Sequence, residues 1–126
     1  MRAAALVVLT LVGLVASPGL LEYRVDAQQP ACLHGPQETP EQAARKRSAL
    51  TFTRQVNTLQ ARATTTNKAY LPADQLQLAA VPAGFEFRLA AVPTGYAFSV
   101  RDNTDPCRFA FFSDQQGLIF QGEVVR

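Results

Sequence analysis

Two runs in which aromatic and small or polar residues alternate flank a polar turn within residues 95–117, and they constrain the fold more than any other part of the chain. Successive side chains of a strand point to opposite faces of a sheet, so each run places its aromatic residues on one side. The pattern predicts two antiparallel strands with one face in the core. The residues expected on that face are Tyr96, Phe98 and Val100 in the first strand and Cys107, Phe109 and Phe111 in the second.

An internal echo precedes and overlaps this stretch. Residues 79–89 read AAVPAGFEFRL, and residues 90–100 read AAVPTGYAFSV. Proline and glycine favour turns, and the alternation that follows them favours a strand, so each unit reads as a turn and then a strand. The sequence therefore predicts four strands joined as a meander. We place them at residues 85–91, 96–101, 107–112 and 118–122.

A helix is expected before the sheet, at residues 40–64. Thr39 is a suitable N-cap, Pro40 suits the first helical position, and Gln42 completes a Thr-x-x-Gln capping box. Apolar residues then recur every three or four positions, which gives the helix one face to bury. The fold class predicted is α+β, one N-terminal amphipathic helix packed on a four-stranded antiparallel meander. The apolar stripe consists of Ala49, Phe52, Val56, Leu59 and Ala63.

The first residues indicate export. Arg2 precedes an uncharged apolar run at residues 3–16, and Pro18 and Gly19 then interrupt it, which is the layout of a secretory signal peptide. An uncleaved membrane anchor formed by residues 3–21 is the alternative. We expect a periplasmic or extracellular protein, and a membrane contact only through this segment if it is not cleaved. The expected organisation is a signal peptide at 1–27, an extended leader at 28–39 and a single domain at 40–126.

The two cysteines, Cys32 and Cys107, are an even pair in a chain expected in an oxidising compartment, so a disulfide is predicted. The single histidine, His34, lies two residues after Cys32. A zinc site of these three residues is conceivable, but it offers at most three ligands and competes with the disulfide. We therefore expect no metal there, and an exposed loop histidine.

Three oxygen-bearing residues, Asp102, Asn103 and Asp105, lie in the turn that joins the second and third strands. Such turns can coordinate Ca²⁺. Aspartate and asparagine also form turns through hydrogen bonds to their own backbone, and we prefer this interpretation. No cofactor is expected, with Ca²⁺ as the alternative.

Three arginines, Arg47, Arg54 and Arg62, fall on the side of the expected helix opposite its apolar stripe. This pattern is typical of a solvated helix face; an anionic surface or nucleic acid as its partner is the alternative. The formal net charge of +2 is too small to indicate a polyanion partner. We expect protein partners, and nucleic acid is not the expected partner.

The chain has no nucleophile elbow, P-loop, His-Glu-x-x-His or Cys-x-x-Cys motif. We therefore expect no enzyme activity, no catalytic residue and no small-molecule substrate. A small secreted enzyme or inhibitor on the same scaffold stays an alternative function.

The order of the predicted elements resembles the globular head of type IV pilins and pseudopilins over about residues 41–122. That resemblance implies a helix packed on an antiparallel meander, and a role in filament or secretion-apparatus assembly. The segments that carry it are 54–61 (RQVNTLQA), 70–72 (YLP), 95–98 (GYAF), 105–109 (DPCRF) and 114–119 (DQQGLI).

The N-terminal part departs from that family. Its filament subunits have a glycine followed by an apolar helix with an early glutamate, whereas here the apolar run precedes Gly19 and Glu22 follows it. The prepilin peptidase motif and the continuous assembly helix are thus absent. We expect an exported, non-enzymatic structural or binding component, with a type IV pilus or type II secretion as its setting. A minor-pilin-like protein that binds DNA or another anionic polymer is the further alternative.

Overall fold

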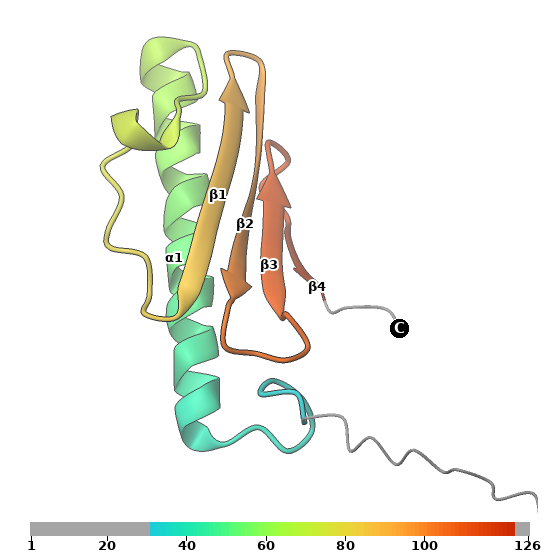
Figure 1. Cartoon of the computed structure of the whole chain (residues 1–126). Helices are drawn as coiled ribbons and strands as arrows, with labels where there is room; N and C mark the ends of the chain where they lie inside the picture. Colours follow the sequence, from blue (N-terminus) through green and yellow to red (C-terminus); the bar gives the residue numbers. More distant parts are fainter. Residues whose placement is uncertain (1–30, 123–126) are drawn as a thin grey trace, which may run out of the picture.

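A single long helix lies against one face of a four-stranded antiparallel sheet in the computed structural model, which describes residues 31–122 (Figure 1). The predicted α+β class and the meander are confirmed. The predicted signal peptide or anchor lies outside the described residues. The elements are α1 (Pro40–Asn67), the short 3₁₀ helix η1 (Ala73–Gln75), β1 (Phe85–Val92), β2 (Gly95–Asp102), β3 (Ala110–Asp114) and β4 (Ile119–Gly122).

The start of α1 is the predicted capping box. The Thr39 hydroxyl accepts a hydrogen bond from the Gln42 backbone N–H at 3.2 Å, and the Gln42 side chain accepts one from the Thr39 N–H at 2.8 Å. These bonds satisfy two donors that a helix start otherwise leaves unpaired.

The end of α1 lies beyond the predicted residue 64. The Lys68 N–H still donates to the Thr64 carbonyl at 3.1 Å, so the helix continues through these residues. The hydroxyls of Thr64 and Thr65 also donate to backbone carbonyls one turn earlier. The helix ends where Lys68 adopts a left-handed conformation, with φ of 59°.

The sheet order is β1-β2-β3-β4, and every neighbouring pair is antiparallel. The third strand begins at Ala110, three residues after the predicted start at 107. The reason is the carboxylate of Asp105, which accepts hydrogen bonds from the backbone N–H groups of Cys107 and Phe109. Those amides are therefore used inside the connection between β2 and β3.

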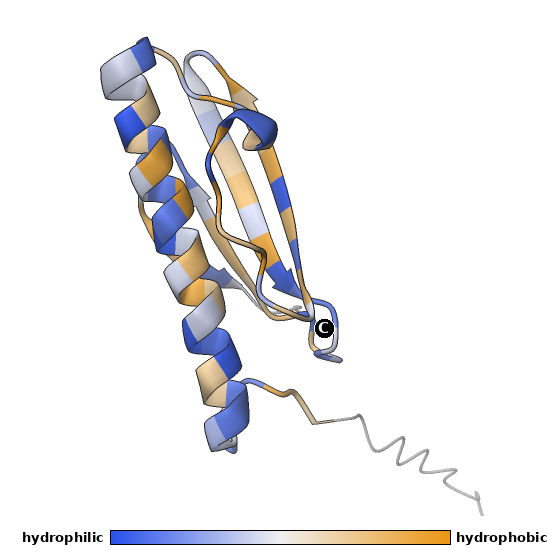
Figure 2. Cartoon of the chain, turned by 90° about the vertical axis from the view of Figure 1, so that its left-hand side faces the viewer, coloured by the Kyte–Doolittle hydropathy of each residue, from blue (hydrophilic) through white to orange (hydrophobic). Residues whose placement is uncertain are grey.

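The core lies between α1 and the sheet, as the alternation predicted. Hydrophilic and hydrophobic residues alternate along α1 (Figure 2), and Ala49, Phe52, Val56 and Ala63 are among its buried residues. All six residues expected on the core face of the two aromatic runs are buried, although Cys107 and Phe109 precede β3. The principal core cluster is Ala49, Phe52, Val56, Phe85, Tyr96, Phe98, Val100, Phe109 and Phe111.

The connection between α1 and β1 is fastened to the helix by the buried side chain of Gln60. Its amide nitrogen donates to the Leu71 carbonyl at 2.7 Å, and its amide oxygen accepts from the Leu71 N–H at 3.0 Å. Gln60 thus pairs with the backbone as a neighbouring strand would, which satisfies its polar atoms inside the protein. Within the described part of the chain, no helix combines the length and the apolar character needed to cross a bilayer.

Candidate functional site

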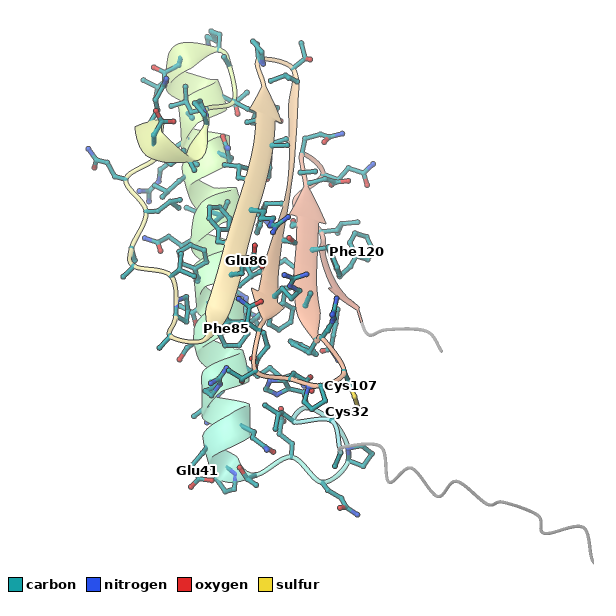
Figure 3. The ribbon with its side chains drawn as sticks, viewed as in Figure 1. Cys32, Glu41, Phe85, Glu86, Cys107 and Phe120 are labelled. Carbon is teal, nitrogen blue, oxygen red and sulfur yellow. A yellow bond between two sulfur atoms is a disulfide. The ribbon has the colours of Figure 1, made fainter. Side chains whose placement is uncertain are left out.

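The leader and the β2–β3 connection are joined at one end of the sheet by the Cys32–Cys107 disulfide, with Cα atoms 5.2 Å apart (Figure 3). This confirms the predicted pair. The bond links residues separated by 75 positions, so it ties the start of the described chain to the sheet. It also uses both thiols that a zinc site with His34 would need.

His34 is buried, with 2% of its surface exposed, so the prediction of an exposed loop histidine is wrong. Its Nδ1 lies 2.7 Å from Glu38 Oε1, and its Nε2 lies 3.0 Å from Asp102 Oδ2. The imidazole also packs on the Phe109 ring, with 4.7 Å between ring centroids. His34 therefore links the leader to the end of β2 and to the connection between β2 and β3.

Asp102, at the end of β2, is the centre of this arrangement, which we call the buried cluster (His34, Glu38, Arg45, Asp102 and Thr104). Besides the histidine, it accepts hydrogen bonds from Arg45 Nη2 at 2.8 Å and from the Thr104 hydroxyl and N–H at 2.8 and 2.9 Å. Burial alone would raise the pKa of Asp102, but the bonds from His34 and Thr104 and the Arg45 charge outweigh burial and lower the pKa.

The buried cluster is closed to a ligand in this conformation. The side chains of His34 and Asp102 are both 0% exposed, and both ring nitrogens face carboxylate oxygens. A neutral imidazole has one N–H and one acceptor nitrogen, so the ring donates to both carboxylates only when both nitrogens carry protons. The cluster therefore joins the leader to α1 and β2 by internal charge-assisted hydrogen bonds.

Arg45 reaches the cluster from α1 past the turn before β1. Its guanidinium carbon lies 5.1 Å from the centre of the Phe85 ring, a cation–π contact. A Cβ at Gly84 would come within 2.8 Å of Arg45 Nη2, and Gly84 has a φ of 80°. The left-handed backbone favours glycine at this position, and any larger residue would also displace the Arg45 guanidinium.

The proposed calcium turn is engaged by protein donors. Asp105 Oδ1 accepts from the Leu33 and Cys107 N–H groups at 3.0 Å each, and the Asn103 carbonyl oxygen of the side chain accepts from Arg101 Nε at 3.3 Å. Asp102 is bound within the buried cluster. Across residues 31–122, no group of three His, Cys, Asp or Glu side chains is arranged to hold a metal ion.

Arg47, Arg54 and Arg62 are all exposed on α1, as the helical pattern predicted. None of the three takes part in the buried cluster. These three cations therefore lie on the helix, apart from the charged residues of the sheet that are described next.

The sheet has a second face, directed away from α1, which we call the outer face. The register pairs Glu86 with Arg101. It also sets Arg88, Ser99, Phe112 and Phe120 in one row across the four strands. Figure 3 labels Glu86 on β1 and Phe120 on β4. A shallow pocket of about 320 Å³ lies on this face. It is lined by Glu86, Arg88, Ser99, Arg101, Arg108, Ala110 and Phe112.

Glu86 is held by two arginines on the outer face. Arg88 Nε donates to its Oε1 at 2.5 Å, and Arg101 Nη2 donates to its Oε2. The hydrogen bond from Arg88 is the main cause that lowers the pKa of Glu86, and the bond from Arg101 adds to it against a smaller cost of burial. The sequence pattern did not identify these residues as a group, although their alternate positions on β1 and β2 place them on one face of the sheet.

No protein-family model, curated protein or solved structure matches this chain. The resemblance to pilin heads rests on the residues quoted for it and on the order of the elements.

Proposed function

We propose that this protein is an exported, non-enzymatic component that binds or assembles with other proteins. The observation that carries the proposal is the Cys32–Cys107 disulfide. Structural disulfides form and persist in oxidising compartments, and the apolar run at residues 3–16 offers a route to one.

The arrangement of polar groups supports binding over catalysis. The acid and base groups of the buried cluster face one another, with His34 and Asp102 withdrawn from solvent. The outer face instead exposes cations and large apolar side chains together, with Phe112 44% and Phe120 54% exposed. Apolar groups gathered on a protein surface favour interaction with a partner.

The setting we propose is a pilus or secretion apparatus, in which the chain acts as a pilin-like or pseudopilin-like head. A helix followed by an antiparallel meander is the order of elements that the resemblance implies, and this order supports the proposal.

Cell fractionation combined with disulfide mapping tests this function. The full chain would be produced in a bacterium with a secretory pathway, and its peptides analysed by mass spectrometry without reduction. We expect the protein in the periplasm or medium, with Cys32 and Cys107 in one linked peptide. A matched chain without residues 1–27 should stay in the cytoplasm with both thiols free. Full-length protein found in the cytoplasm, or exported with free thiols, would contradict the proposal.

A further inference from the structure

The described surface is more basic than the formal net charge of +2 suggests. Asp102 and Asp105 are buried, and Glu38 and Glu86 are partly covered and paired with basic groups. Six basic side chains but only two acidic ones are exposed among residues 31–122, and Asp114 is half-buried. The basic ones are Arg47, Arg54, Arg62, Lys68, Arg88 and Arg108, and the acidic ones are Glu41 and Asp74.

The outer face gathers part of this excess beside exposed aromatic rings. We propose that it binds a protein partner through a segment that places a carboxylate next to an apolar side chain. The carboxylate would lie in the pocket among Arg88, Arg101 and Arg108, and the apolar side chain on Phe112 and Phe120. The inference deepens the proposed function, because it names the surface and the chemistry of the partner on which that function depends.

Arg108 is the strongest single reason to place the carboxylate here. It is exposed, lines the pocket, and its guanidinium has no hydrogen-bonded or ionic partner within the described chain. Its backbone adopts a left-handed conformation with φ of 51°, which is unfavourable for a non-glycine residue. A strained arginine with a free guanidinium fork is suited to bidentate recognition of a carboxylate.

The apolar half of the surface is also preformed. A Cβ at Gly122 would meet Phe112 Cε2 at 2.6 Å and Cδ2 at 3.3 Å, so the Phe112 ring lies across the glycine on β4. The ring is thus supported by the sheet while 44% of the residue stays exposed. Phe120 is its direct cross-strand neighbour, and the two rings form a continuous apolar surface beside the pocket.

The distribution of charge favours a protein segment over a polyanion. The outward positions of the opposite end of β1 and β2 are Ala90 and Ala97, and Asp114 lies beside them on β3. The cations are thus confined to one end, whereas a nucleic-acid backbone needs a track of cations along its path. A second copy of this chain is a poor partner as well, because Glu41 and Asp74 are the only exposed carboxylates among residues 31–122, and neither lies on a strand.

The test is a selection from a library of short random peptides displayed on phage, against the purified, disulfide-bonded protein. We expect selected peptides to carry Asp or Glu adjacent to an aromatic or aliphatic residue. Their binding would then be measured by fluorescence anisotropy. Arg108→Gly should weaken it at least about tenfold, as expected for loss of a charge-assisted anchor, and higher salt should weaken it too. Arg54→Gln removes the same charge from α1 and should leave binding unchanged.

Arg108→Gly separates binding from folding, because glycine adopts a positive φ without strain and the variant should unfold no earlier than the original protein. Peptides without the acidic and apolar pair, or binding unaffected by Arg108→Gly, would overturn the inference. Tighter binding of a labelled oligothymidylate, lost in Arg108→Gly, would replace it with nucleic-acid binding. If cell fractionation finds the protein in the cytoplasm but the acidic peptides still bind this surface, the inference stands and the proposed export is rejected.

Discussion

In both charged clusters of this protein, two basic side chains bind one carboxylate, but the clusters differ in their exposure to water. In the buried cluster, Asp102 accepts bonds from His34 and Arg45, and on the outer face Glu86 accepts bonds from Arg88 and a neighbouring arginine. The Asp102 side chain is 0% exposed, whereas those of Glu86 and Arg88 are 26% and 74% exposed. Breaking a buried pair leaves an uncompensated charge, but water replaces an exposed partner at little cost. The first cluster is therefore suited to holding the fold, and the second to exchanging partners.

The largest effect should come from removing the disulfide that brings the leader to the buried cluster. Cys32→Ser combined with Cys107→Ser should lower the free energy of unfolding by about 4 kcal/mol, because the bond restricts a long loop of the unfolded chain. Urea denaturation measures the change. Reduction of the unaltered protein serves as the control and should give a similar loss. A loss below about 1 kcal/mol would contradict this cause and show that the bond adds little to the stability of the fold.

Asp102→Asn should have the next largest effect, a loss of about 3 kcal/mol at neutral pH. The amide keeps the shape of the side chain but removes the charge that His34 and Arg45 face, and it turns one acceptor into a donor. Urea denaturation at pH 7 measures the loss. A variant as stable as the original would show that the buried cluster contributes nothing net to folding.

The pH dependence of that loss identifies the charge as its cause. The pKa of Asp102 is lowered in the folded protein, whereas an aspartate in the unfolded chain titrates near 3.9. The stabilisation is complete above the unfolded value and is lost as the pH falls through the folded value. The difference between the original and Asp102→Asn should therefore be constant near neutral pH and shrink below about pH 4. A difference that stays constant into acid would point to packing as the cause.

The sequence predicts the outline of this molecule because its main elements have local causes. The capping residues at Thr39 and Gln42 and the alternation through Tyr96 and Phe98 act over a few positions, and these predictions are confirmed. The disulfide was predictable because only one pairing of two cysteines exists. The helix end was misplaced since threonine has low helical propensity on average, yet Thr64 bonds back within the helix.

The buried cluster could not be predicted, because its contacts are distant in sequence. His34 and Asp102 are separated by 68 positions, and nothing around either residue marks it as the partner of the other. The start of β3 was misplaced for a different reason, since Asp105 accepts hydrogen bonds from the amides of Cys107 and Phe109, two and four residues further on. Such local bonds from a side chain to the backbone leave no periodic pattern in the sequence.

Tyr96→Phe removes an uncharged hydrogen bond of a buried side chain. The loss of stability should be smaller than that of Asp102→Asn and larger than that of Glu86→Gln. The Tyr96 hydroxyl donates to Asn57 Oδ1 at 2.8 Å, and burial is the main cause that raises its pKa to about 12. Removing the hydroxyl should cost about 1 kcal/mol, the usual net contribution of an uncharged hydrogen bond. Urea denaturation at neutral pH measures the loss, and an unchanged stability would contradict it.

The stability of Tyr96→Phe at alkaline pH provides a second test of this hydrogen bond. Tyrosine in the unfolded chain titrates near 10, below the folded value, so ionisation favours unfolding as the pH rises from about 10 toward 12. Tyr96→Phe has no proton to lose at this site, and its deficit should narrow over that range. A deficit that does not narrow would mean that the raised pKa makes no contribution to stability.

Glu86→Gln should have the smallest effect, and it is the matched partner of Asp102→Asn, because each replaces a carboxylate between two basic groups by its amide. Here the arginines stay accessible to water and to salt, so losing the carboxylate leaves no buried charge behind. The pKa of Glu86 is lowered, so any contribution exists above the unfolded value near 4.3 and disappears in acid. The urea midpoint at neutral pH should match that of the original protein, and high salt should remove any residual difference.

If Glu86→Gln were as destabilising as Asp102→Asn, the outer arginines would be part of the folding framework, and a partner carboxylate could not replace Glu86 as their ligand. If the variant instead folds normally and binds acidic peptides more tightly, Glu86 is an internal competitor that the partner displaces.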